Sequence, residues 1–131
     1  MEYGYDTFRT ELPEDQLEML LDLGAEMDLY IDPTASLECE QYFSGLLSDY
    51  RGDREGLRAY CREAIRRDFR VMKEKPAWLQ GDEWQFHNGR PMAFVGQLDA
   101  VLRRDGSPYG LSFYVFYDLE DGAVKTVTQC D

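Results

Sequence analysis

The stretch that decides the fold is residues 111–118, Leu111-Ser112-Phe113-Tyr114-Val115-Phe116-Tyr117-Asp118. Its dense aromatic and β-branched side chains are typical of a strand buried on both faces, because both sides of the pleat then need apolar cover. We therefore expect it to be the central strand of a sheet. Alternate side chains point to opposite faces, so Tyr114 and Phe116 belong to one face and residues 113, 115 and 117 to the other.

Strand patterns lie on both sides of this stretch. Residues 123–130 alternate apolar and polar side chains after a turn at Gly122, which predicts a hairpin that ends the chain. Upstream, residues 84–87 predict a short strand that runs into an Asn-Gly turn, and residues 92–98 predict the strand that follows. The polar composition of residues 103–108 predicts an exposed loop.

The residues before the strands have helical periodicity. The first helix begins at Pro13, and the second begins with Asp32 as its cap and Pro33 in its first position. The third covers residues 54–73. The side chains expected to face inward on the second and third helices are Leu37, Cys39, Phe43, Leu46, Leu47, Tyr50, Leu57, Tyr60, Cys61, Ala64, Ile65, Phe69 and Met72.

Helices followed by strands indicate the α+β class. We expect one domain over residues 1–131, with a helical part at about residues 13–75 and a sheet part at about residues 84–130. About three helices should pack on one face of an antiparallel sheet of four to five strands.

Negative charge is concentrated in the first half of the chain. Residues 1–50 contain thirteen Asp or Glu and only Arg9 as a base, so they carry a charge equal to the −12 of the whole chain. Such a field repels nucleic acid and anionic lipid and speeds the encounter with a basic partner. We therefore expect a basic protein as partner, with neither nucleic acid nor membrane, although acidity for solubility alone is the simpler alternative.

The candidate partner-binding residues are the carboxylates of the first two helices. Four of them recur every fourth residue, and the full set is Glu14, Glu18, Asp22, Glu26, Asp28, Glu38 and Glu40. An opposite ladder of arginines follows on the third helix: Arg54, Arg58, Arg62, Arg66 and Arg70. We favour pairing of this ladder with the earlier carboxylates, or solvation, over contact with nucleic acid.

Residue types that carry catalysis are scarce. His87 is the only histidine and stands beside a turn, and the three cysteines are widely spaced, so we predict no metal centre, no disulfide and no cofactor. The adjacent acids Asp82 and Glu83 have no evident partner base. No phosphate-binding glycine motif occurs. We therefore expect that the chain is not an enzyme.

The sequence also predicts a cytoplasmic protein. No apolar run approaches the roughly 18 to 20 residues that a transmembrane helix needs. The first residues, Met1-Glu2-Tyr3-Gly4-Tyr5-Asp6, lack the apolar centre of a secretory signal.

Residues of the sheet part resemble a known family. With Trp84, Gly89-Arg90-Pro91-Met92, Phe94-Val95-Gly96-Gln97-Leu98 and Phe113-Tyr114-Val115-Phe116-Tyr117-Asp118, residues 76–131 resemble the YwqG-like family of bacterial proteins. The helical part has no counterpart in that family. Some relatives with this kind of domain look like immunity proteins, so the resemblance implies a binding module more than a catalyst.

Two functions remain open from the sequence. The leading one is a non-catalytic interaction protein, most plausibly an immunity-type inhibitor that binds a basic toxin or effector through its acidic surface. The alternative is a small-ligand-binding domain with a pocket around Trp78, Trp84 and Gln97.

Overall fold

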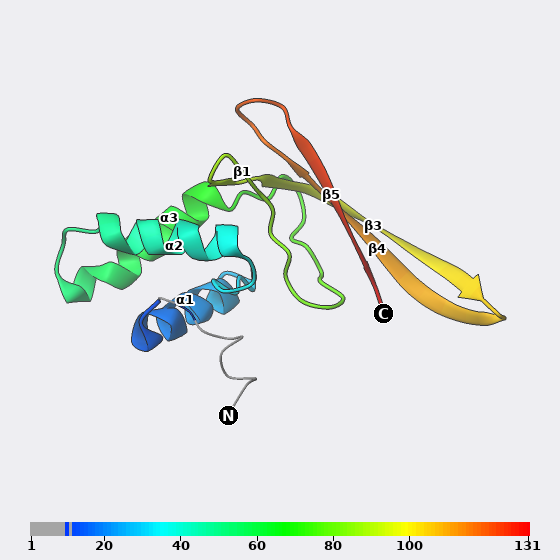
Figure 1. Cartoon of the computed structure of the whole chain (residues 1–131), viewed down its shortest axis with the longest axis horizontal. Helices are drawn as coiled ribbons and strands as arrows, with labels where there is room; N and C mark the ends of the chain where they lie inside the picture. The colour runs from blue at the N-terminus through cyan, green and yellow to red at the C-terminus, as the bar shows by residue number, and fades with distance from the viewer. Residues whose placement is uncertain (1–9, 11) are drawn as a thin grey trace.

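The structure is a computed structural model that describes residue 10 and residues 12–131. Its helices are α1 (Glu14–Glu26), α2 (Leu37–Asp49) and α3 (Leu57–Asp68), with the 3-10 turn η2 (Arg54–Gly56) before α3. Its strands are β1 (Phe86–His87), β2 (Arg90–Pro91), β3 (Ala93–Arg104), β4 (Ser107–Tyr117) and β5 (Val124–Cys130). Figure 1 shows the helices gathered at one end of the molecule and the long strands at the other.

The expected α+β class is confirmed, and the strands divide into two sheets. β3, β4 and β5 form an antiparallel sheet with β4 in the centre, as predicted for residues 111–118. β1 and β2 form a separate two-stranded hairpin around the Asn-Gly turn. The expected sheet of four to five strands is therefore a three-stranded sheet and a small hairpin beside it.

β4 is buried on one face only. Tyr114 and Phe116 are fully buried, whereas Tyr117 on the other face is 39% exposed and Phe113 and Val115 are partly exposed. The division of side chains between the faces is as predicted, but the expectation that both faces are buried is wrong. The helices and the loop of residues 76–85 lie on the Tyr114 side, so among the described residues nothing covers the opposite side.

The hairpin of β3 and β4 is longer than the sequence predicted. Pairing continues to Arg104 and Ser107, so the exposed loop expected at residues 103–108 is a two-residue turn. Asp105 and Gly106 at its tip both have positive φ, 54° and 83°, the conformation of the turns that suit twisted hairpins. In Figure 1 this hairpin projects away from the helices.

The second helix begins later than predicted. Instead of capping a helix, the Asp32 carboxylate accepts hydrogen bonds from the backbone N–H and hydroxyl of Thr34, so the chain makes a turn. Ser36 is the cap, and its hydroxyl accepts the backbone N–H of Cys39. Leu37, predicted to face inward, is 69% exposed at this helix start.

The third helix ends earlier than predicted because its last residues join the sheet. The N–H of Phe94 donates to the carbonyl of Arg70, and the N–H of Met72 donates to the carbonyl of Phe94. These bonds hold the chain extended after Phe69 and end α3 at Asp68. Met72, predicted to face inward, is 56% exposed as a result.

Aromatic rings join the helices to the sheet. The Trp84 ring meets Phe69 edge-on at 5.6 Å on the helical side and Phe116 at 5.9 Å on the sheet side. Trp78 stacks on Tyr114 at 4.6 Å, so the loop of residues 76–85 lies against the middle of β4. Edge-on and offset-stacked rings are the favourable arrangements of aromatic pairs.

Two matched substitutions test the one-sided burial of β4. Phe116→Ala should lower the free energy of unfolding by about 3 to 5 kcal/mol, because it empties a fully buried site. Phe113→Ala makes the same change three residues earlier, on the uncovered face, and should cost about 1 kcal/mol. Urea denaturation of dilute protein measures both, and equal losses would contradict the assignment of the faces.

Candidate functional site

The arginine ladder of α3 pairs with the carboxylates of α1. Arg58 and Arg62 contact the two oxygens of Glu26 at 2.8 and 2.5 Å, and both bonds lower the pKa of that carboxyl, the bond from Arg62 most. Arg58 also lies 3.8 Å from Asp22. The ladder is therefore largely occupied within the chain, as we favoured from the sequence.

Two other acidic candidates, Asp28 and Glu40, contact residues outside the arginine ladder. Asp28 lies 3.9 Å from Lys75. Glu40 accepts a hydrogen bond from the hydroxyl of Thr10. The side chains of Asp22 and Asp28 remain 74% and 68% exposed, and exposed pairs at such distances contribute little to stability.

Three of the predicted acids form no ion pair with a described residue. Within residue 10 and residues 12–131, no ion pair involves Glu14, Glu18 or Glu38, and all three are exposed. Glu14 and Glu18 stand one turn apart on α1 and therefore share a face. With Asp22 on the next turn they form a row of exposed carboxylates, which we call the α1 acidic row (Glu14, Glu18 and Asp22).

A cavity of about 370 Å³ lies where the helices meet the hairpins. It is lined by three arginines: Arg67 at the end of α3, Arg70 in the segment after α3 and Arg90 on β2. The acids that pair with two of them, Asp68 and Asp118, line it as well. No ion pair involves Arg70 in the part of the chain that the structure describes. This cavity was missed from the sequence because Arg67 and Arg90 lie outside the regular ladder.

Carboxylates fix the other two guanidinium groups of the cavity. Arg67 donates two hydrogen bonds to Asp68, which also accepts the hydroxyl of Tyr42. Burial alone would raise the pKa of Asp68, but the bonds from Arg67 and Tyr42 outweigh it and lower that pKa. Burial and the bond to Asp68 raise the pKa of Tyr42, so its hydroxyl stays protonated and serves as a donor.

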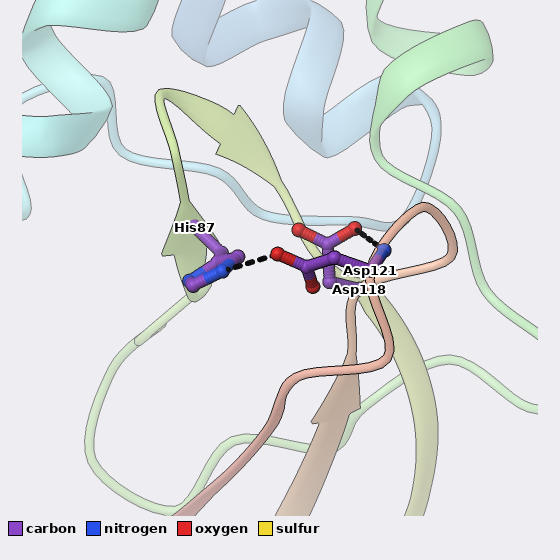
Figure 2. A group of neighbouring side chains, drawn as sticks. All are labelled: His87, Asp118 and Asp121. Atoms are coloured by element: carbon purple, nitrogen blue, oxygen red, sulfur yellow. Dashed lines mark hydrogen bonds and ion pairs between the residues drawn. The ribbon is translucent and has the colours of Figure 1, made fainter.

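A second group beside this cavity gathers His87, Asp118 and Asp121, and each offers a ligand atom within 4.8 Å of the others (Figure 2). The ring Nε2 of His87 lies 2.8 Å from Asp121. The Asp118 carboxylate is already occupied, because it accepts the backbone N–H of Glu120 and the guanidinium of Arg90. The cluster therefore links the β1–β2 hairpin to the turn after β4, and we call it the His87 clasp (His87, Asp118 and Asp121).

Sequence spacing gave no signal for this clasp. His87 stands more than thirty residues before the two acids, and only the pairing of β3 with β4 brings them together. The guanidinium of Arg90 lies 3.1 Å from Asp118, so one of the three candidate metal ligands already pairs with a positive charge.

The three side chains predicted to line a ligand pocket, Trp78, Trp84 and Gln97, make contacts within the chain. Trp84 is 4% exposed, and its ring meets that of Trp78 at 5.8 Å. The Gln97 amide accepts the N–H of Ala77 and donates to its carbonyl, which ties the loop to β3. Trp84 lines a cavity of about 110 Å³ and Gln97 lines another of about 340 Å³, so these two side chains border different spaces.

Asp82 is the most perturbed acid in the described chain. It lines a small cavity of about 110 Å³ with Cys39 and accepts the backbone N–H of Asp32 at 3.1 Å. Burial raises its pKa from 3.8 to about 6. Burial also raises the pKa of the Cys39 thiol, and that of Cys61 to about 11, so neither is a ready nucleophile.

No family model, curated protein or solved structure proved similar to this chain. Among the described residues, no helix has the length and apolar character needed to cross a membrane.

Asp82→Asn tests the burial of this acid. Because the folded chain holds the proton more tightly than the unfolded chain, the stability that Asp82 contributes is complete below pH 3.8 and is lost as the pH rises through about 6. The neutral amide avoids this loss, so the variant should exceed the wild type by roughly 1 to 2 kcal/mol near pH 8 and by little near pH 4.

Urea denaturation at both pH values measures the difference. Glu38→Gln is the control, because it removes one charge from an exposed side chain of the same small cavity. A constant difference between wild type and Asp82→Asn across the pH range would show that the acid titrates normally.

Proposed function

We propose that this chain is a non-catalytic cytoplasmic interaction protein that binds a basic protein, in the manner of an immunity-type inhibitor. The observation that carries the proposal is the α1 acidic row, where Glu14 and Glu18 are exposed and Asp22 is held only at 3.8 Å. Nucleic acid and membrane are not its partners, because the same charge repels both.

The distribution of ion pairs supports a partner on this side of the molecule. Glu26 pairs with both Arg58 and Arg62 at the C-terminal end of α1. Towards the N-terminal end the pairs are longer, because Asp22 lies 3.8 Å from Arg58 and Asp15 lies 3.8 Å from Arg54. Glu14 and Glu18 pair with no described cation, and a row of exposed carboxylates on one helix steers a cationic partner and fixes its orientation.

The state of the candidate nucleophiles supports binding over catalysis. The thiols of Cys39 and Cys61 are buried and protonated at neutral pH. The only histidine is bonded to Asp121 in the clasp. The two buried thiols therefore present no activated nucleophile to a substrate.

Charge reversal of the α1 acidic row tests the proposal. Glu14→Lys with Glu18→Lys should abolish capture of a basic protein from the native lysate. The melting temperature should fall only slightly, because neither carboxylate pairs with a described cation and only Glu14 lies in the first turn of α1, near the positive end of the helix dipole. Capture by the wild type should weaken steeply between about 0.05 M and about 0.5 M salt.

The matched control is Asp49→Lys with Glu74→Lys, which changes the net charge by the same amount at two exposed sites away from α1. It should retain the captured protein. Equal loss from both double variants would mean that total charge, and not the α1 acidic row, governs association.

A second candidate, binding of a small anion, is favoured by the cavity between the helices and the hairpins. Arg70 brings to a cavity of about 370 Å³ a guanidinium that pairs with no acid in residue 10 or residues 12–131, and that volume suits a small ligand. Arg67 and Arg90 are already oriented there by Asp68 and Asp118. A ligand with a phosphate or carboxylate group is the class that such donors recognise.

Titration with inorganic phosphate, followed by calorimetry, tests this candidate. Arg70→Ala should weaken binding roughly tenfold, the loss expected for about one charge-assisted hydrogen bond. Arg66→Ala removes the same charge from α3 outside the cavity and should have little effect. Absence of saturable binding to the wild type, or equal weakening by both variants, would exclude the anion site.

A further inference from the structure

The uncovered face of the three-stranded sheet carries an apolar surface. Directly paired residues share a face, and Leu98 pairs with Phe113 while Leu102 pairs with Tyr109. We call the side chains on this side the open face. Its exposed and partly exposed members are Gly96, Leu98, Ala100, Leu102, Arg104, Ser107, Tyr109, Leu111, Phe113, Val115, Tyr117, Val124, Thr126, Thr128 and Cys130.

Several of these side chains are strongly exposed for their type. Leu98 is 66% exposed, Val124 is 60% exposed and Leu102 is 41% exposed. Contiguous apolar surface of this kind on a folded chain marks a site of association, whereas scattered exposed side chains need no such explanation.

The charge of the open face indicates what covers it. In a chain with 26 Asp or Glu, none of the open-face residues is acidic. Its single charged side chain, Arg104, lies over the ring of Tyr109 at 5.4 Å. The basic partner proposed above needs carboxylates, which this face lacks. A second copy can meet here without apposing acids, although elsewhere two chains of net charge −12 repel each other.

We propose that the open face binds the open face of a second copy of this chain, which makes a two-layer sheet sandwich with twofold symmetry. Antiparallel sheets pack face to face about 10 Å apart with their apolar sides inward, and a symmetric dimer uses the same patch on both subunits. This surface lies on the sheet, apart from the α1 acidic row on the helices, so both associations are compatible in one assembly (Figure 1).

The size of the face suits a reversible dimer. Standard strand dimensions make it roughly 30 Å long and roughly 15 Å wide over its three strands. Two such faces in contact bury on the order of 1,000 Å², which is near the lower bound for a specific interface. We therefore expect an equilibrium between monomer and dimer that depends on concentration.

Sedimentation equilibrium of the purified full chain tests the dimer. Between about 1 µM and about 100 µM, the weight-average mass should rise from 15.3 kDa toward twice that value. Leu98→Glu should hold the mass at 15.3 kDa, because each subunit would then bury an unpaired carboxylate in the apolar interface. A wild type that stays monomeric, and so leaves the face for a different protein, would overturn the proposal.

Leu37→Glu is the matched control. Leu37 at the start of α2 is 69% exposed and Leu98 is 66% exposed, so the two substitutions introduce the same charge at equally accessible leucines. Leu37→Glu should still dimerise. Dimerisation of both variants would exclude the open face and point to another contact, such as an edge of the sheet.

A chemical probe separates loss of dimer from loss of fold. Cys130 is exposed on the open face, whereas Cys39 and Cys61 are buried. Alkylation of Cys130 in the wild type should slow as protein concentration rises, and in Leu98→Glu it should not depend on concentration. Rapid alkylation of a buried cysteine would identify an unfolded variant, and a rate independent of concentration in the wild type would contradict the dimer.

Discussion

The contact on which the rest of the structure depends is the ring of Trp84 between the helices and the sheet. It meets Phe69 after α3 and Phe116 on β4, and its indole N–H reaches the carbonyl of Leu29 after α1 at 3.3 Å. One side chain thus touches three parts of the chain that are far apart in sequence. The helices alone lack a second layer, and the sheet alone lacks cover for Tyr114 and Phe116. Each part therefore buries its apolar surface only where the two pack together around Trp84, a contact that we call the Trp84 joint.

Periodicity was enough to predict the order and class of the elements, because it reflects which side chains one element buries. It could not locate the ends that tertiary contacts determine. α3 ends because the backbone of Phe94 forms hydrogen bonds with Arg70 and Met72, on either side of Val71. α2 begins late because the Asp32 carboxylate accepts the N–H of Thr34. The prediction of a strand covered on both sides failed for a related reason: composition reveals an apolar face, but it does not reveal whether this chain or another molecule covers it.

For the candidate site, too, the sequence predicted the repeats but not the tertiary contacts. The repeat of acids on α1 and of arginines on α3 was visible in the sequence, and pairing within the chain was the favoured outcome. Which acids would be paired was not visible, since the crossing of the two helices decides that Glu26 meets two guanidinium groups while Glu18 meets none among the described residues. The arginine-lined cavity and the His87 clasp depend on strand pairing across more than twenty residues, so spacing carried no trace of them.

The Trp84 joint also makes tryptophan fluorescence a measure of how the helices pack on the sheet. Trp78 and Trp84 are the only two tryptophans in the chain, and their rings lie 5.8 Å apart between the helices and the sheet. Trp84 is 4% exposed, and Trp78 is partly buried with its indole N–H enclosed and without a hydrogen-bond partner among the described residues. Both fluorophores are therefore largely shielded from water in the folded chain. Intrinsic emission therefore follows the docking of the two halves and is silent on helix or hairpin formation by itself. A blue-shifted spectrum means a closed joint, and a red shift on dilution, heating or mutation means that water has entered between the layers.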